Sequence, residues 1–177
     1  MKGLCSGLVF AFALACLPSS GQARALIPEQ PLLSGEQANF VVVKKHAHEL
    51  ILYDRGQVLR TYRISLGYGG LGPKRREGDG RTPEGLYRID GRNPDSLYHL
   101  ALHISYPSAR DVAAAHARGQ NPGGEIMIHG VPNDASGVIA KAYNRIDWTA
   151  GCISVSDRAI EEIWRLVPDG TPVDILP

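Results

Sequence analysis

The chain has 177 residues, of which 44% are hydrophobic and 21% are charged, and its formal net charge is +1. These proportions are ordinary for a globular protein and the length suggests one domain, while 20 glycines and 12 prolines point to many turns and loops. A chain this close to neutral lacks the basic character that nucleic-acid binding usually needs, which argues against nucleic acid as the main partner.

Residues 1–25 have the pattern of a secretory signal peptide. Lys2 supplies a minimal positive region, and residues 8–17 form an apolar core that is too short to span a bilayer as a helix. Small residues near the end of this segment offer cleavage sites, and we favour cleavage after Ala25 over cleavage after Ala23. We therefore expect the chain to be exported to the periplasm or the cell envelope.

Cys16 offers a second route of export. The preceding Ala13-Leu14-Ala15 resembles a lipoprotein motif only weakly, because alanine stands where leucine is usual, so we rank lipidation of Cys16 below signal cleavage. No later segment is apolar enough to be a membrane anchor, which predicts no integral membrane segment after signal removal. The polar residues 26–38 then form an N-terminal lead, and residues 39–177 form the domain.

The domain is predicted to open with short strands. Residues 40–43 and 49–53 read as two strands, and Asp54-Arg55-Gly56 reads as the turn after the second. Residues 58–66 alternate between apolar and polar side chains, which predicts a half-buried strand with Val58 on its buried face. Such short turns favour antiparallel hairpins.

A glycine-rich segment follows these strands. The spacing Gly67-x-Gly69-x-x-Gly72 matches a dinucleotide-binding fingerprint, but that fingerprint must open a helix, whereas Pro73 follows here. We therefore reject nucleotide binding and predict a mobile loop over residues 67–80. Its basic run Lys74-Arg75-Arg76 could meet an anionic substrate, although a solvated loop face is the simpler explanation.

The next segment raises the question of a metal site. Residues 85–90 read as a strand, and Arg92-Asn93-Pro94 as a turn. His99 and His103 are four positions apart, which would suggest a metal pair on a helix. The surrounding leucines are typical of a strand instead, and there is neither an H-E-x-x-H motif nor a cysteine pair. We therefore predict no metal and no cofactor.

Two helices are predicted in the second half of the chain. The first covers residues 108–117, with Ser108 as its cap and Asp111 near a capping-box position. The last begins at Ser156 or Asp157. Its apolar face, which we expect in the core, consists of Ile160, Ile163, Trp164 and Val167.

Short strands complete the predicted fold. Residues 125–129 form a strand that delivers His129 at its end, and residues 172–176 form a closing strand. A short helix around residues 138–143 is a further option. Strands outnumber helices and sit mostly in hairpins. The sequence therefore predicts a mainly antiparallel β fold with two or three short flanking helices.

Cys152 is the one cysteine after residue 16, and His129 lies upstream of it. In an exported enzyme such a pair is a candidate nucleophile with its base, since a nearby imidazolium lowers the pKa of a thiol. Gly151 lets the backbone bend beside the sulfur, and the N–H groups of Gly151 and Cys152 are candidate oxyanion donors. These residues alone leave a buried core cysteine as the alternative. An unpaired cysteine in an oxidising compartment is a liability without a function, which favours the nucleophile.

The order of several motifs resembles one enzyme family. Ile128-His129-Gly130, followed by Thr149-x-Gly151-Cys152-Ile153, resembles the signature of the YkuD-type L,D-transpeptidases, which are cysteine enzymes acting on peptidoglycan stem peptides. Residues 78–85 resemble the G-D-x-x-T-P-x-G segment of the same family. The similarity covers about residues 39–177. It implies the β-sandwich or barrel-like catalytic domain of that family.

The resemblance also implies a chemistry. Cys152 attacks the carbonyl of the L-centred residue at the third stem position, with His129 as base or as its ion-pair partner. The terminal D-alanine leaves, and an amine or water resolves the thioester. A backbone carbonyl orients the histidine in this family, which maps to Gly130. Asp147 is a candidate for that role from the sequence alone, with a solvated loop carboxylate as the alternative.

Two positions depart from the family pattern, since Ala150 replaces a histidine and Ser154 replaces an arginine. The second departure bears on how the carboxylate of a substrate is held. Four residues near the motif are candidate contacts for the substrate: Trp148, Thr149, Tyr143 and Ser154. The two aromatic residues serve equally well as packing. The expected partners are stem peptides and a wall-anchored protein as a further acceptor.

Three functions stay open at this point. The first is an L,D-transpeptidase in cell-wall biogenesis or remodelling. The second is a hydrolase or L,D-carboxypeptidase on the same scaffold. The third is a catalytically silent wall-binding module with a structural cysteine.

Overall fold

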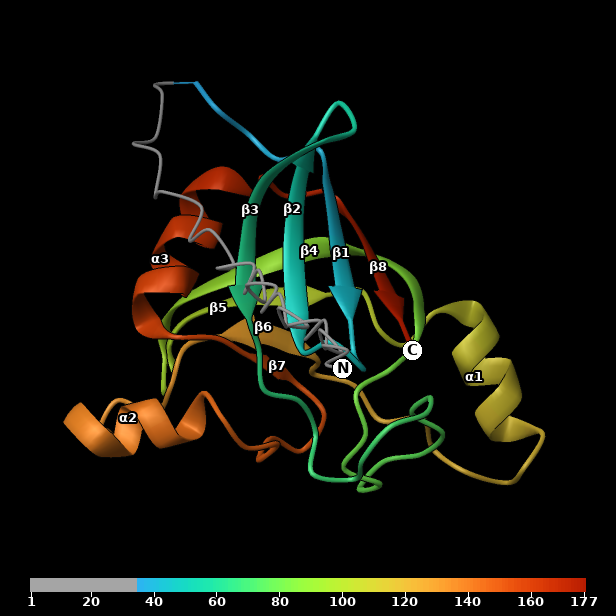
Figure 1. Cartoon of the computed structure of the whole chain (residues 1–177). Coiled ribbons are helices and arrows are strands. Elements are labelled where there is room, and N and C mark those ends of the chain that lie inside the picture. Colours follow the sequence, from blue (N-terminus) through green and yellow to red (C-terminus); the bar gives the residue numbers. More distant parts are fainter. Residues whose placement is uncertain (1–34) are drawn as a thin grey trace, which may run out of the picture. The chain divides into compact units, whose positions relative to one another are not determined.

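The computed structural model describes residues 35–177, which contain eight strands and three helices (Figure 1). The predicted signal peptide, its cleavage sites, Cys16 and residues 26–34 of the lead lie outside the described residues. The strands are β1 (Phe40–Lys44), β2 (Glu49–Asp54), β3 (Gln57–Arg63), β4 (Gly85–Ser96), β5 (His99–Ile104), β6 (Met127–His129), β7 (Ile153–Ser154) and β8 (Pro172–Leu176). The helices are α1 (Ala109–His116), α2 (Gly137–Tyr143) and α3 (Asp157–Leu166).

The strands form one sheet in the order β3-β2-β1-β8-β4-β5-β6-β7. Neighbouring strands are antiparallel except for β1 with β8 and β6 with β7, which are parallel. Just beyond β3, the N–H of Ser65 donates to the carbonyl of Ser154 in β7, and the N–H of Ser154 donates back, both at 2.8 Å. This bridge joins the two ends of the strand order. The predicted mainly β, barrel-like architecture with short helices is confirmed.

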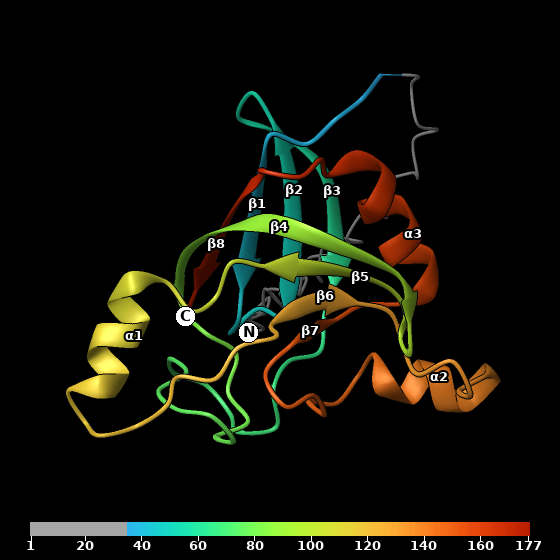
Figure 2. The same ribbon diagram turned by 180° about the vertical axis from the view of Figure 1, so that it is seen from behind.

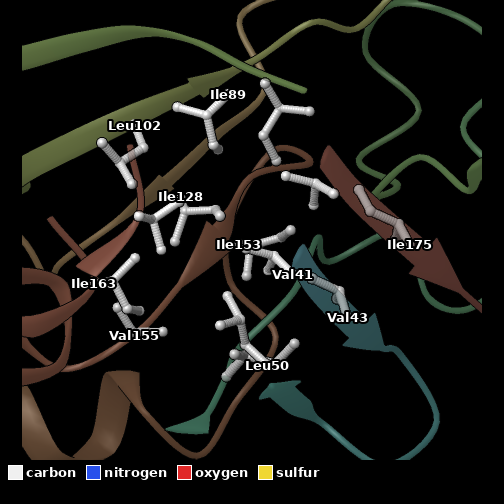
Figure 3. Packing of buried hydrophobic residues seen from close by; sticks show 14 of the residues in the cluster. Val41, Val43, Leu50, Ile89, Leu102, Ile128, Ile153, Val155, Ile163 and Ile175 are labelled. Carbon is white, nitrogen blue, oxygen red and sulfur yellow. The ribbon is translucent and has the colours of Figure 1, made fainter. Parts of the chain in front are cut away.

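The hydrophobic core lies between the curved strands and α3 (Figure 3). Helix α3 is capped by Ser156, whose hydroxyl accepts from the N–H of Ala159, and it buries Ile160, Ile163 and Leu166. Trp164, predicted as a core residue, is only partly buried and packs at the edge of the core, where the guanidinium of Arg92 lies 4.8 Å from its ring. The capping box predicted for α1 is present between Ser108 and Asp111.

Two details of the strand prediction are wrong. The expected turn at residues 92–94 is part of β4, where Arg92 and Asn93 pair with β5. Strand β8 pairs only with residues 85–88 of β4, so Pro94 lies where its missing N–H removes no ladder hydrogen bond.

Val58 is the second error, because it is 56% exposed. The register of β2 with β3 shifts so that Leu52 faces Arg60 while Tyr53 faces Val58, which leaves Leu59 as an extra residue. A bulge of this kind reverses the alternation of side chains along a strand. Leu59 consequently packs against the core in place of Val58.

The glycine-rich segment, which was expected to be a mobile loop, is held by buried hydrogen bonds. The buried ammonium of Lys45 donates to the carbonyls of Gly72 and Thr82 at 2.6 and 2.9 Å and to Glu84 at 2.8 Å. Gly67 approaches the opposite side of the segment so closely that a Cβ there would lie 2.1 Å from the carbonyl oxygen of Gly80. Glycine is therefore required at this crossing for steric reasons.

We predict that Lys45→Met lowers the free energy of unfolding by about 2–4 kcal/mol, because it leaves Glu84 and two carbonyls without their buried donor. The neighbouring Lys44 is exposed, and Lys44→Met should change stability by less than about 0.5 kcal/mol. Urea denaturation followed by circular dichroism measures both. Equal effects of the two substitutions would show that Lys45 does not hold the segment.

Candidate active site

The parallel pairing of β6 with β7 brings the two predicted catalytic residues to neighbouring positions (Figure 2). His129 is the last residue of β6, and Cys152 directly precedes β7. In the register of this pair, Ile128 faces Ile153 and His129 faces Ser154. This register places Cys152 level with Met127, two residues before His129, so the two predicted catalytic residues lie on adjacent segments of the sheet.

The surroundings of Cys152 favour a neutral thiol at rest. Burial raises its pKa, and the nearby charge of Glu125 adds to this, while the backbone N–H of Met127 and the charge of Lys74 lower it. The thiol donates to the backbone carbonyl of Glu125, with 3.4 Å between the two heavy atoms. Within the described part of the chain its hydrogen bond thus goes to this carbonyl rather than to the imidazole. Catalytic hydrogen bonds often tighten only when substrate is bound.

His129 is buried, with 3% exposure, and its ring is held in one orientation. Its Nδ1 donates to the carbonyl of Gly130 at 2.7 Å, which leaves Nε2 of the neutral ring as the basic nitrogen. Burial lowers the pKa of His129, although the hydrogen bond to Gly130 opposes this. The raised thiol pKa and the lowered imidazole pKa both favour a neutral resting pair over the ion pair that the sequence also allowed.

Gly130 is itself fixed by its neighbours. Its N–H donates to the carbonyl of Tyr98 at 2.9 Å, and its carbonyl also accepts from the hydroxyl of Ser154 at 3.3 Å. A Cβ at this position would lie 2.5 Å from Oδ1 of Asp157, so a side chain does not fit. The carbonyl that orients His129 is therefore held from both sides.

The loop before Cys152 is organised by Thr149. The Thr149 hydroxyl donates to the carbonyl of Cys152 at 2.7 Å and accepts from the N–H of Gly151 at 3.1 Å. One of the two predicted oxyanion donors is therefore already engaged. The N–H of Cys152 makes no hydrogen bond to any residue from 35 to 177, which leaves it as the available donor.

Two predicted substrate contacts turn out to be internal. Thr149 is 4% exposed, and its hydroxyl is used within the loop. Ser154 is fully buried and bonded to Gly130, so the residue that replaces the family's arginine supports the histidine from inside rather than facing a ligand. Hydroxyl groups this small readily form such local hydrogen bonds to the backbone.

Tyr143 and Trp148, the remaining predicted contacts, belong to an aromatic cluster around the histidine. Their ring centroids lie 4.8 Å apart, and the centroid of Trp148 lies 5.7 Å from that of His129. Tyr98 packs closest to the imidazole, with 4.6 Å between centroids. Sequence reasoning missed Tyr98, because no motif marks it and only the pairing of β5 with β6 places it beside the site.

Asp147 has a different role from either one expected. Its carboxylate accepts from the N–H of Leu66 at 2.8 Å and from Nε2 of His48 at 3.1 Å. It therefore fastens the loop before Cys152 to the chain beyond β3, and it does not orient His129.

The two histidines considered as a metal-binding pair, His99 and His103, both lie on β5 but bond to different partners. His99 bonds to Glu161 at 2.8 Å, whereas His103 bonds to Asp90 at 2.5 Å. Residues 35–177 contain no group of three His, Cys, Asp or Glu side chains placed to hold a metal ion. None of the helices α1 to α3 has the length and apolar character that crossing a membrane requires.

Comparisons with known proteins agree on one family. Residues 38–175 match YkuD, the L,D-transpeptidase catalytic domain. The protein named "Putative L,D-transpeptidase YafK" from Escherichia coli strain K12 is 32% identical over 134 residues, which cover 72% of this chain and 46% of that protein.

Solved structures share the fold. The helical cell shape determining protein Pgp2 from Campylobacter jejuni has a TM-score of 0.58 and 27% identity, over 80% of this chain and 48% of that one. An L,D-transpeptidase from Mycobacterium smegmatis has a TM-score of 0.52 and 18% identity, over 79% and 59% of the two chains.

The chain spans about half the length of the curated relatives that it matches. The family match, however, extends over nearly all of the described residues and includes both His129 and Cys152. The chain belongs to the YkuD family of L,D-transpeptidase catalytic domains.

Proposed function

We propose that the chain is a cysteine-dependent L,D-transpeptidase that acts on peptidoglycan stem peptides in the cell envelope, through a thioester acyl-enzyme. The observation that carries the proposal is the buried His129, whose Nδ1 is committed to the Gly130 carbonyl, on the strand that pairs with the one that Cys152 directly precedes. A role in cell-wall remodelling is supported by the structural likeness to the Campylobacter cell shape protein.

The reaction begins from the neutral pair. As Cys152 turns from the Glu125 carbonyl, Nε2 of His129 accepts the thiol proton and the sulfur attacks the carbonyl at the third stem position. The N–H of Cys152 stabilises the resulting oxyanion. The imidazolium then gives its proton to the departing D-alanine amine, and a thioester remains.

The acceptor decides between two functions. Transfer needs an amine bound beside the thioester with bulk water excluded. The tied-down segment 67–84 and the aromatic cluster supply rigid walls for such a site, which favours transfer. Hydrolysis to a tripeptide, by the same steps with water as acceptor, is the alternative, and a silent wall-binding module is the third candidate.

Removing the sulfur tests the nucleophile. Cys152→Ala should lower turnover of a disaccharide-tetrapeptide at least about 1,000-fold, because no thioester can form. Cys152→Ser should be nearly as inactive, since a hydroxyl is a much poorer nucleophile in a site built for a thiol. Liquid chromatography of the muropeptides measures turnover, and thermal unfolding checks that the variants fold. Turnover near the wild-type rate in Cys152→Ala would refute the mechanism and favour the silent module.

The pH dependence tests the neutral pair. Because burial raises the thiol pKa, the rate of alkylation by iodoacetamide should increase with pH and reach its midpoint above the ordinary value for cysteine. Because burial lowers the imidazole pKa, the acid limb of turnover should lie below the ordinary value for histidine, since the base must be deprotonated. An alkylation midpoint near or below neutrality would show a resting ion pair instead.

The fate of the acyl-enzyme separates transferase from carboxypeptidase. Incubation of the purified chain with a disaccharide-tetrapeptide and D-methionine should exchange the terminal residue or produce a cross-linked dimer, which mass spectrometry identifies. The Cys152→Ala variant is the matched control. Clean conversion to the tripeptide, with no exchange at high D-methionine concentration, would overturn the transferase in favour of the hydrolase.

A further inference from the structure

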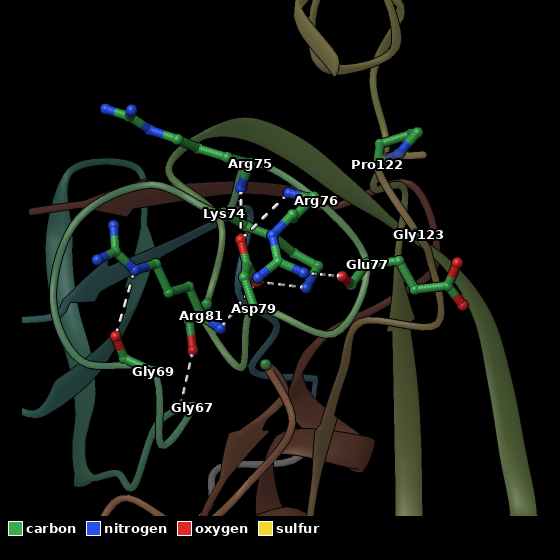
Figure 4. Close-up of polar contacts among 12 residues, drawn as sticks. Gly67, Gly69, Lys74, Arg75, Arg76, Glu77, Asp79, Arg81, Pro122 and Gly123 are labelled. Atoms are coloured by element: carbon green, nitrogen blue, oxygen red, sulfur yellow. Dashed lines mark hydrogen bonds and ion pairs between the residues drawn. The ribbon is translucent and has the colours of Figure 1, made fainter. Parts of the chain in front are cut away.

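A basic cleft of about 520 Å³ lies beside the proposed active site, and we call it the arginine cleft. Four arginines dominate its lining (Figure 4 shows its loop side). They are Arg75, Arg76 and Arg81 from the glycine-rich segment and Arg118 from the chain just after α1. Of the basic run considered from the sequence, Lys74 does not contribute, because it is buried against Asp79.

The one carboxylate in the lining of this cleft is fully occupied. Asp79 accepts from the ammonium of Lys74 at 2.9 Å and from the backbone N–H groups of Arg75, Arg76 and Arg81 at 2.7, 3.2 and 3.1 Å. Burial alone would raise the pKa of Asp79, but these hydrogen bonds outweigh it and lower the pKa to about 2. Asp79 therefore stabilises the conformation of the loop. The guanidinium groups of the cleft remain available to another anion.

The guanidinium groups are positioned mainly by carbonyls. Nη2 of Arg118 donates to the carbonyl of Arg75 at 2.9 Å, and Nε of Arg81 donates to that of Gly69 at 3.2 Å. A guanidinium has five N–H donors, so each keeps further donors for a ligand. Elsewhere in residues 35–177, Arg60 and Arg92 are instead paired with carboxylates. The side chain of Arg75 extends from the loop on the side away from Glu77 (Figure 4).

Both segments that line the arginine cleft also approach the chain around Cys152. On the first, the carbonyl oxygen of Arg81 lies 2.8 Å from where a Cβ on Gly151 would be. The second lines the cleft with Arg118 and Gln120, and five residues after Gln120 the carbonyl of Glu125 accepts from the thiol of Cys152. The N–H of Glu77 donates to the carbonyl of Asn121 at 2.8 Å, which joins the two segments. A peptide that reacts at Cys152 would thus meet a basic surface on the same two protein segments that carry the arginines.

We propose that the arginine cleft binds a free carboxylate of the peptide that reacts at Cys152. The planar guanidinium fork matches a carboxylate in two parallel hydrogen bonds, and several arginines line the same cleft. The carboxylate belongs either to the donor stem peptide or to the acceptor. The inference rests on the proposed function, because it takes its ligand from the proposed substrate.

Binding to protein that lacks the sulfur tests the cleft without any turnover. In the full chain with Cys152→Ala, isothermal titration calorimetry compares Arg75→Gln/Arg118→Gln with the control Arg88→Gln/Arg165→Gln, which removes two exposed arginines outside the cleft. The ligands are a disaccharide-tetrapeptide as donor, D-methionine as acceptor, the carboxamide of each, and inorganic phosphate.

One of the two acids should bind the cleft variant about tenfold more weakly than the control, with its carboxamide unaffected, because two charge-assisted contacts are lost. The acid that responds identifies the donor or the acceptor. Arg75 makes no side-chain hydrogen bond or ion pair with residues 35–177, so Arg75→Gln alone should fold normally and weaken binding in part, and Arg75→Lys should restore some of it.

The proposal is overturned if both acids bind the cleft variant and the control equally, if acid and carboxamide do not differ, or if neither acid binds. Binding of phosphate without either acid would assign the cleft to a phosphorylated polymer and also overturn it. Failure of this proposal is distinguishable from failure of the proposed function, since turnover and its loss in Cys152→Ala report on the thioester, whereas this titration reports on the carboxylate.

Discussion

The shared carbonyl of Gly130 is the contact on which the site depends. It accepts from Nδ1 of His129 and from the hydroxyl of Ser154, and these two residues face each other across the parallel β6–β7 pair. Because one acceptor serves both strands, the orientation of the ring is tied to the register of the sheet. The Ser65–Ser154 bridge that joins the ends of the strand order passes through the same pair. The contacts that close the barrel and those that orient His129 therefore share the same pair of strands.

Close backbone approach is the second constraint. Gly67 crosses Gly80, Gly130 abuts Asp157, and Gly151 abuts Arg81, each at a distance that excludes a Cβ. Because glycine has no side chain, three loops can approach closely at these contacts, near Cys152. Near these contacts, the side chains of Thr149, Asp79 and Lys45 form hydrogen bonds with neighbouring polar groups. The loops around the candidate site are thus closely packed and hydrogen-bonded, as the proposed reaction, which depends on positioning, requires.

Local signals in the sequence predicted what local physics controls. The caps of α1 and α3 and most strands follow from short-range pattern and chemistry, and the pair of His129 with Cys152 stays a prediction from the same kind of signal. The missed features depend on register and long-range contacts. A single bulge reversed the faces of β3 and exposed Val58, the one-sided pairing of β4 accommodated Pro94, and Lys45 reached across the fold to hold the glycine-rich segment. Tyr98 and Arg118 join their sites only after the sheet and α1 are assembled.

In the proposed mechanism, the neutral thiol has a consequence for how long Cys152 escapes oxidation. Peroxide and disulfides react with the thiolate, so a half-buried sulfur whose pKa is raised presents little of the oxidisable form. In the described chain Cys152 has no cysteine with which to form a disulfide. Its reactivity is instead withheld until a substrate displaces the Glu125 carbonyl and exposes the sulfur to the base. The same burial that delays ionisation would therefore protect the proposed nucleophile from oxidative loss.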